Sequence, residues 1–321
     1  MKKKILLIAI VFLTTICTIN ISAEENNLNI ICTNSILSDF TANLITENVN
    51  IEYIMPAGVC PAFYDTTPGD VSKIINADIL ISFGDAKKEP WLADLLAYNT
   101  DCEIIECKDL GEWNIPTGAK TYVNHLSEQL QQILPEQENT IQTNTENYLT
   151  QIDTTSSNLK QLVETFNYQN TPIICMQWQE DFLEWLGLNV VYSYGPPQGL
   201  SAQDEIDIIN TIGNNDVYAI IDNLQSGTDY GAHIASETGI SHIIFTNFPE
   251  AIPGTDNYLD MITYNTNQLI QGIDTYNYKQ GEISALTQEI SQTQMQRDIT
   301  VFIALAFIIL TIILFIMYKR K

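Results

Sequence analysis

The sequence predicts an α/β protein made of two lobes with mostly parallel sheets, joined by a long backbone helix and followed by a C-terminal transmembrane helix. Three observations support this fold class. Short β-rich runs alternate with segments of helical period, and this pattern occurs in two sets of four. The segment between the two sets, residues 127–167, has no strand signal, and residues 299–317 carry no charge. Alternating strands and helices are typical of a parallel sheet covered by helices.

Each lobe contains four predicted strands. In the first lobe, residues 24–126, the strands are residues 28–32, 51–54, 78–82 and 103–107. In the second lobe, residues 168–278, they are residues 172–176, 189–192, 217–221 and 242–245. Segments such as residues 36–44 and 202–212 have the helical period between them. Because the alternation occurs twice, we expect two separate α/β lobes.

The segment that connects the lobes is predicted to be helical. Its apolar residues form a loose helical stripe in a polar background, and Pro135 interrupts the stripe early. We therefore expect a long helix from about residue 136 to 165. After the second lobe, residues 265–273 also have a helical period. Residues 279–298 are predicted to form a helical stalk, for which a coiled-coil dimer is left open.

The two ends of the chain indicate export and anchoring. Residues 1–23 begin with three lysines, continue with an apolar run and end in Ala23, which is typical of a secretory signal peptide. An uncleaved anchor is the alternative. Residues 299–318 are predicted to cross the membrane, since 19 uncharged residues in a helix span about 28 Å. The basic residues 319–321 indicate a cytoplasmic C-terminus. The localisation predicted is the cell membrane, single-pass, with the body extracytoplasmic.

The charge of the chain limits its partners. The 321 residues include 14 Lys+Arg and 39 Asp+Glu, which give a net charge of −25. All the acids lie between the signal segment and the membrane segment. Such an acidic body argues against nucleic acid or anionic lipid as the main partner. Six cysteines are too few for a small disulfide scaffold.

The sequence contains no signature of catalysis. No glycine-rich phosphate loop, nucleophile elbow or metalloprotease histidine pair is present, and the chain has only three histidines. We therefore predict a protein that is not an enzyme and name no catalytic residue. A binding role remains.

Candidate binding residues follow the predicted strands. In open α/β sheets the ligand sits at the carboxyl ends of the strands, and with two lobes these ends face each other across a cleft. The candidates on these loops are Cys60, Tyr64, Trp113, Met176, Gln177, Asp222 and Asn247.

At these loops the chain resembles the zinc/manganese-type (cluster A-I) solute-binding proteins of ABC transporters. Residues 56–70 read PAGVCPAFYDTTPGD, which is similar to the family loop P-x-G-x-D-P-H-x-Y-E-P-T-P-x-D. Residues 76–92 and 254–265 resemble two further family stretches, and the similarity covers about residues 28–275. The resemblance implies two lobes joined by a long helix, a small hinge motion, and delivery of a metal ion to a membrane permease and its ATPase.

The family's metal ligands are not retained. The resemblance places its four ligand positions on Ala62, Gly111, Met176 and Asn247, which replace histidine or carboxylate. Alanine and glycine offer no side-chain ligand, so zinc or manganese could not be held in the usual way. The three histidines fall in predicted helices or a strand and are not expected to be ligands.

Three kinds of altered site are open, and one of them is a conventional transition-metal site that uses nearby acids such as Asp65, Asp109 or Asp222. Sulfur from Cys60 and Met176, with Asn247, would suit a soft ion such as Cu(I), or zinc. Alternatively these cysteines are plain core, and Cys60 and Cys107 are the pair expected if a disulfide forms. Uncharged hydrogen bonders and aromatics would suit a small organic molecule or a chelated metal. These are Tyr64, Trp113, Gln177, Trp178, Asn223 and Asn247.

The function predicted is the membrane-anchored solute-binding component of a metal-type ABC importer with a non-standard site. Its solute would be a metal ion or a small molecule bound in the cleft, and its partners the permease and ATPase. The alternative is a surface interaction protein that retains the fold but has lost metal binding.

Overall fold

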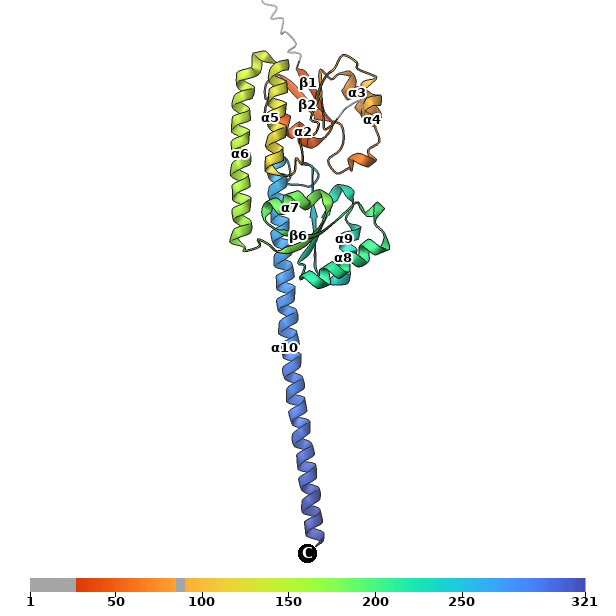
Figure 1. The fold of residues 1–321 in the computed structure, drawn as a ribbon, viewed down its shortest axis with the longest axis vertical. Coiled ribbons are helices and arrows are strands. Elements are labelled where there is room, and N and C mark those ends of the chain that lie inside the picture. Colours follow the sequence, from red (N-terminus) through yellow and green to blue (C-terminus); the bar gives the residue numbers. More distant parts are fainter. Residues whose placement is uncertain (1–26, 85–89, 321) are drawn as a thin grey trace, which may run out of the picture. The chain divides into compact units, whose positions relative to one another are not determined.

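The computed structural model describes residues 27–84 and 90–320, which form two compact units (Figure 1). The predicted signal peptide, residues 1–23, lies outside the described residues. Unit 1 consists of the chain up to Pro56, Phe63–Leu110 and Thr121–Leu149. Unit 2 consists of Ala57–Ala62, Gly111–Lys120 and the chain from Thr150 onward. Two short segments are thus assigned to unit 2 although their neighbours in sequence belong to unit 1.

Unit 1 is built on a four-stranded parallel sheet in the order β2-β1-β3-β4. The strands are β1 (Leu28–Cys32), β2 (Val49–Tyr53), β3 (Ile79–Ser82) and β4 (Glu103–Glu106). Its helices are α2 (Ser35–Ala42), α3 (Pro68–Ile75), α4 (Pro90–Leu96), the part of α5 (Pro116–Ile133) from Thr121 onward, and the first part of α6 (Glu138–Thr165).

Helices cover both faces of this sheet. On one face Ile31 and Leu80 pack against Ile74 of α3 and Leu92 of α4. On the other face the aromatic ring of Phe40 in α2 contacts the rings of Tyr122 in α5 and Tyr148 in α6, both at 6.3 Å between centroids. Side chains along β1 point alternately to the two faces of the sheet, which accounts for the two separate sets of contacts.

Unit 2 repeats the same topology, with the parallel order β6-β5-β7-β8. The strands are β5 (Pro172–Met176), β6 (Asn189–Tyr194), β7 (Ala219–Asn223) and β8 (Ser241–Phe245). The helices are α7 (Glu180–Leu186), α8 (Ala202–Asn215), α9 (Asp229–Thr238) and α10 (Tyr258–Lys319). One face of the sheet packs against α8 and α9 through a buried cluster that includes Ile174, Ile208, Ile220 and Ile234. The doubled α/β fold predicted from the sequence is confirmed.

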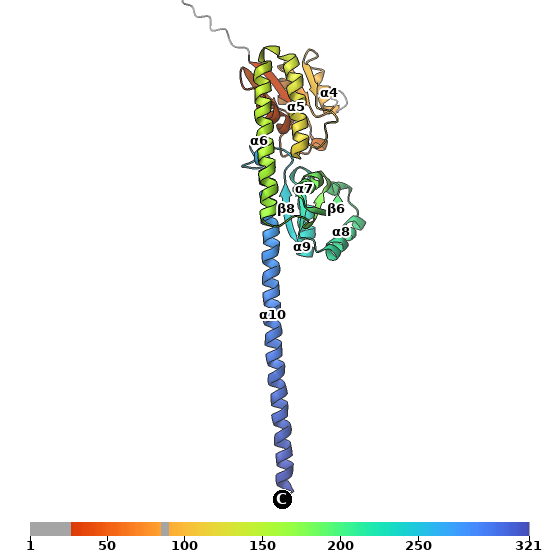
Figure 2. The ribbon, with the colours of Figure 1, turned by 60° about the vertical axis from the view of Figure 1, so that its left-hand side comes forward.

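Helix α10 is the longest element, with 62 residues (Figure 2). Its first part packs on unit 2, and the last residue buried there is Ile273. The sequence predicted separate helices over residues 265–273, the stalk and the membrane segment; the structure instead has one unbroken helix. No proline or glycine pair interrupts residues 274–319, so nothing in the sequence stops the helix. Its apolar part reaches a mean hydropathy of 3.2 over 18 residues, which is long and apolar enough to cross a membrane.

The predicted elements agree closely with those observed. Strands β1 and β5 have the predicted limits, and the others differ by at most two residues at either end. The helix expected after Pro135 is α6, which begins at Glu138 after the 3₁₀ helix Pro135–Gln137. Proline at the start of that turn separates α5 from α6, because it cannot continue the hydrogen-bond ladder of α5.

Candidate functional site

The carboxyl ends of β5, β7 and β8 lie at one edge of the unit 2 sheet, because these strands are parallel neighbours. Polar side chains follow each of the three strands. We call the set formed by Gln179, Asn223, Gln225, Thr246 and Asn247 the strand-end network. All five residues are buried.

Gln225 is the centre of this network. Its Nε2 donates to the Ala57 carbonyl at 2.8 Å and to Thr246 Oγ1 at 2.9 Å. Its Oε1 accepts from Asn223 Nδ2 at 3.0 Å and from the Asn247 backbone N–H at 3.2 Å. A primary amide has two N–H donors and two acceptor lone pairs, so the side chain of Gln225 is fully used. The network therefore fixes the loops rather than presenting free ligands.

Asn247, on which the sequence resemblance placed the fourth ligand position, is also engaged in hydrogen bonds. Its Oδ1 accepts from Gln179 Nε2 at 2.8 Å, and Gln179 is only 1% exposed. Its backbone carbonyl accepts from Trp113 Nε1 at 3.0 Å. The Trp113 ring stacks on Phe248 with 5.9 Å between centroids. Trp113 and Asn247, both predicted site residues, are therefore in contact in unit 2.

Asn114, the residue after Trp113, carries a buried polar atom that lacks a hydrogen-bond partner among the described residues. Its Nδ2 donates to the Trp178 carbonyl at 2.8 Å, and the residue is 3% exposed. Its Oδ1 is buried and has no hydrogen-bond partner among the described residues. Buried acceptors are normally paired, and an exception in a native structure calls for a donor from a bound molecule or water.

Asp222, another predicted site residue, is fully buried and makes hydrogen bonds that are separate from the strand-end network. Its Oδ1 accepts from the Tyr194 hydroxyl at 2.6 Å, and its Oδ2 accepts from His242 Nε2 at 2.7 Å. Burial, together with the Asp222 carboxylate, raises the pKa of Tyr194 well above its ordinary value. A Cβ on Gly231 would stand 2.2 Å from Asp222 Oδ2, so helix α9 can approach the carboxylate only because this residue is glycine.

The other predicted positions do not assemble a metal site. Met176 is 0% exposed and belongs to the apolar cluster under α8 and α9. Cys60 is half-buried, Ala62 and Gln177 are exposed, and Gly111 has a left-handed backbone with φ of 85°. Across residues 27–84 and 90–320, no group of three His, Cys, Asp or Glu side chains is placed to hold an ion.

The described cysteines are all free, so the expected Cys60–Cys107 disulfide is a prediction that the structure corrects. Cys107 is buried in the core of unit 1, where burial raises the pKa of its thiol well above the ordinary value. His125 and His233 lie in helices and His242 in a strand, as predicted.

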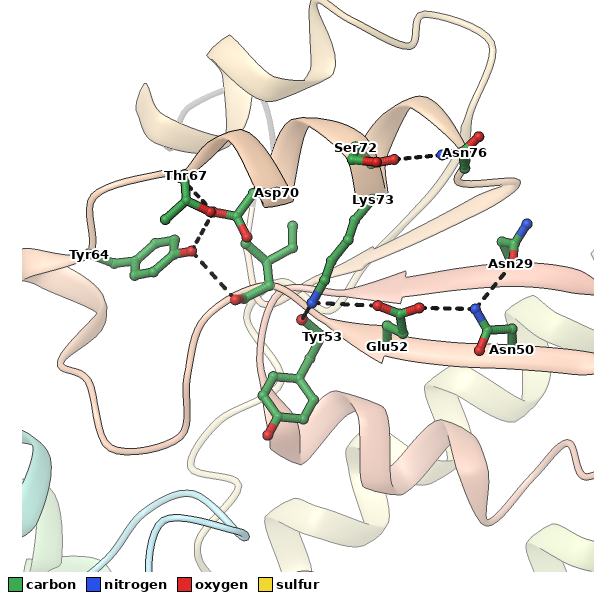
Figure 3. Close-up of polar contacts among 11 residues, drawn as sticks. Asn29, Asn50, Glu52, Tyr53, Tyr64, Thr67, Asp70, Ser72, Lys73 and Asn76 are labelled. Carbon is green, nitrogen blue, oxygen red and sulfur yellow. Dashed lines mark hydrogen bonds and ion pairs between the residues drawn. The ribbon is translucent and has the colours of Figure 1, made fainter.

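Tyr64 lies in unit 1 and has a structural role in its loop (Figure 3). Its hydroxyl donates to Asp70 Oδ2 at 2.7 Å, and the same oxygen accepts from Thr67 N at 2.6 Å. Thr67 and Asp70 form the capping box at the start of α3. Burial and the nearby carboxylate raise the pKa of Tyr64 well above its ordinary value. Lys73 of the same helix donates from Nζ to the carbonyl of Tyr53, the last residue of β2, at 2.6 Å (Figure 3).

Sequence reasoning missed three residues of this region: Gln179, Gln225 and Asn114. Gln179 lies three residues after the end of β5 and Gln225 two residues after the end of β7, and this closeness to strand ends is the signal that could have found them. Asn114 follows the predicted Trp113 directly. The glutamines were passed over because they do not resemble metal ligands.

Two parallel α/β units of the same strand order, with polar residues at strand ends, define a two-lobed solute-binding fold. The chain matches the family described as zinc-uptake complex component A, periplasmic (ZnuA), over residues 30–272. It therefore belongs to this family of metal-binding ABC-transporter substrate-binding proteins, whose members are not enzymes.

Several relatives are similar to the chain. "Manganese-binding lipoprotein MntA" of Halalkalibacterium halodurans is 22% identical over 278 residues, which cover 78% of this chain and 90% of the relative. "Metal ABC transporter substrate-binding lipoprotein SsaB" of Streptococcus sanguinis is 32% identical, but only over 79 residues, 22% of this chain and 26% of the relative.

Solved structures show the same fold. A Mn-bound periplasmic metal binding protein from Candidatus Liberibacter asiaticus matches with a TM-score of 0.66 at 18% identity, covering 77% of this chain and 99% of that chain. A ZnuA crystal structure matches with a TM-score of 0.64 at 16% identity, covering 77% and 99%.

Proposed function

We propose that the chain is the membrane-tethered solute-binding component of a metal-type ABC importer, and that its solute is a metal ion that already carries other ligands. Family membership supports the importer role, and helix α10 supports the tether. In this proposal residues 299–318 cross the membrane, the body is extracytoplasmic, and the solute is passed to a permease driven by an ATPase.

The class of solute is proposed from the chemistry of the strand-end face of unit 2, by which we mean the side of the unit at which β5, β7 and β8 end. The four family ligand positions hold alanine, glycine, a core methionine and a hydrogen-bonded asparagine. A bare divalent transition-metal ion needs imidazole, carboxylate or thiolate ligands to replace its hydration shell. Uncharged amides whose hydrogen bonds are already made cannot supply such ligands. A bare ion would therefore lose more free energy on leaving its hydration shell than it would gain on binding.

A chelated ion has different requirements. Its outer surface consists of the chelator's carboxylates, amines and hydroxyls, which are recognised by hydrogen bonds and ring stacking. Asn114 Oδ1 is a buried acceptor without a donor, and it lies next to Trp113 in sequence. In the proposed complex a donor of the chelator pairs with this oxygen, while the strand-end network holds the loops in place.

The test is a thermal-shift titration of the full chain in detergent micelles. Bare Zn²⁺ and Mn²⁺ are compared with their citrate and histidine complexes, with the chelators alone as controls. A complex added at about 100 times its Kd stabilises the native state by about 2.7 kcal/mol, a readily measured rise in Tm. We expect a rise with at least one complex and none with the bare ions.

A matched pair of variants locates the site. Asn114→Leu removes the buried acceptor and should abolish the shift, whereas Asn214→Leu makes the same change on an exposed position of α8 and should retain it. A rise in Tm with bare ions would contradict the proposed solute class. If no ion or complex changed Tm, the carrier function would fail and the alternative of a surface interaction protein would gain support.

The tether has its own test. The full chain should stay with membranes after alkaline carbonate extraction, and a chain ending at Asp298 should be soluble. A C-terminal tag should react with antibody only after the cells are permeabilised. Labelling of this tag on intact cells would contradict the proposed orientation.

A further inference from the structure

Strand β8 is the edge of the unit 2 sheet, and one side of it has no neighbouring strand. The Ser241 N–H donates to the Tyr218 carbonyl on the β7 side at 3.0 Å. In a strand the backbone groups of successive residues point to opposite sides. The backbone groups of Ser241, Ile243 and Phe245 therefore pair with β7, and those of His242 and Ile244 point to the outer edge.

The next residue of this outward series, Thr246, is capped by a side chain. Its N–H donates to Asn265 Oδ1 at 3.1 Å, and its carbonyl accepts from Asn265 Nδ2 at 2.8 Å. One amide side chain of α10 thus makes the pair of hydrogen bonds that a neighbouring strand would make. Among the described residues no corresponding partner meets the outward backbone groups of His242 and Ile244.

These open groups line a groove of about 610 Å³. One wall is α9, with the small residues Ala232, Ala235 and Ser236. The other wall is α10, from Tyr264 to Lys279. Between the walls run residues 240–244 of the edge strand, half-buried at His242 and Ile244. A groove with unpaired strand groups at its base and helices at its sides fits an extended peptide.

The charge of the groove indicates which peptide. The chain has 39 acids and 14 basic residues, yet the lining contains Lys279 and His242 and no Asp or Glu. His242 is held by the buried Asp222, which leaves Lys279 as the cation open to a ligand. The groove therefore favours a segment with a carboxylate at its Lys279 end.

A second copy of this chain does not fit. Ser241 Oγ donates to the Gly272 carbonyl, and Thr246 pairs with Asn265, so β8 and α10 run antiparallel side by side. Two-fold pairing of β8 with its copy would place the two strands antiparallel, and hence the two α10 helices antiparallel as well. With the tether proposed above, the two helices cross one membrane in the same direction and cannot take that arrangement.

We propose that this groove binds an extended, carboxylate-bearing segment of a partner protein, which adds to β8 as a fifth strand. Backbone hydrogen bonds to His242 and Ile244 hold the segment in register. The small residues of α9 leave room for its side chains, and Lys279 pairs with its carboxylate. This docking site is separate from the strand-end face proposed for the solute.

The test uses a fluorescein-labelled eight-residue peptide of alternating valine and threonine that ends in a free aspartate. Binding to the full chain in micelles is followed by fluorescence anisotropy. The same peptide N-methylated on alternate backbone amides, and a version ending in lysine amide, are the controls. We expect saturable binding of the parent peptide and at least tenfold weaker binding of both controls.

Variants locate the groove. Ile244→Pro removes an outward N–H without taking a bond from β7, a place where proline is tolerated on an edge strand. Ala232→Trp fills the groove from an exposed position of α9 and does not touch the strand. Each should weaken binding at least tenfold. Lys279→Glu should also weaken binding, whereas Lys108→Glu, the same change on an exposed residue of unit 1, should not.

Two results would overturn the proposal. One is the absence of saturable binding to the unaltered chain. The other is binding that survives Ala232→Trp and Ile244→Pro but is lost in Asn114→Leu, because the peptide would then occupy the strand-end face. A failure of the solute titration leaves the peptide assay unaffected, so the docking proposal and the proposed solute class are tested separately.

Discussion

The side-chain oxygen of Asn247 accepts a hydrogen bond from Gln179 Nε2 at 2.8 Å, so the atom that the sequence resemblance predicted to face a metal ion is already engaged. Both residues are buried, and Gln225 holds the Asn247 backbone at the same time. Amide groups thus satisfy one another where relatives are expected to bind an ion. This pairing underlies the proposed change of solute, and it can be tested by mutation.

Replacing Gln179 should destabilise unit 2. In Gln179→Ala the Asn247 oxygen stays buried and loses its donor, which costs about 1–3 kcal/mol. Gln198→Ala, at an exposed position, should change stability by less than about 0.5 kcal/mol. Urea unfolding followed by circular dichroism measures both. Equal stability of the two variants would mean that the pair contributes nothing.

Gly231→Ala should be strongly destabilising. The new Cβ would meet Asp222 Oδ2 at 2.2 Å and force apart the contacts of Asp222 with Tyr194 and His242. We expect a loss of about 3 kcal/mol or more in the free energy of unfolding. Gly213→Ala in α8, where nothing lies within 4 Å, should instead stabilise by about 0.5–1 kcal/mol. If both substitutions changed the free energy of unfolding alike, α9 would not approach Asp222 as closely as described.

Glu112 should make stability depend on pH. Burial, with a smaller effect of Asp181, raises the pKa of Glu112 in the folded protein. The native state then binds more protons than the unfolded state, so stability falls as pH rises from the ordinary glutamate pKa through the raised one. At pH 7 the Glu112→Gln variant should therefore unfold at a higher urea concentration than the parent chain. At pH 4 the two should unfold at the same urea concentration. A difference that does not change with pH would contradict this.

The cysteines should differ in reactivity. Cys60 is half-buried on its loop, whereas burial raises the pKa of Cys32 to about 12. Burial and Asp78 raise the pKa of Cys102 to about 11, so about one thiol in a thousand is ionised there at pH 8. Iodoacetamide labelling at pH 8 with peptide mass mapping should mark Cys60 first in the folded chain. Equal labelling of Cys60 and Cys32 would show that unit 1 is not packed as described.

Much of the fold was predictable from the sequence. The strands are short apolar runs bounded by polar turns, and Pro135 marks the boundary between α5 and α6. The one helix that the sequence divided, α10, runs on because residues 274–298 contain no proline, and the single Gly281 weakens a helix without ending it.

The candidate site was predictable only in part. Position along the strands identified Trp113, Asp222 and Asn247 as polar residues at strand ends. Their partners could not be found this way, because side-chain pairs such as Gln179–Asn247 and His242–Asp222 join residues 68 and 20 positions apart. Met176 as a sulfur donor stays a prediction; its side chain lies in the apolar cluster of unit 2, and the sequence could not decide this because the side of the strand to which a side chain points depends on register.

Metal analysis of the full chain tests most directly whether the altered ligand positions still hold a bare ion. The chain, purified in micelles without chelator, is dialysed against equimolar Zn²⁺ and Mn²⁺ and its metal content is measured, beside a Cys60→Ser variant. We predict far less than one ion per chain, with no difference between the two proteins. One ion per chain, lost on Cys60→Ser, would contradict the account and establish a sulfur-based metal site.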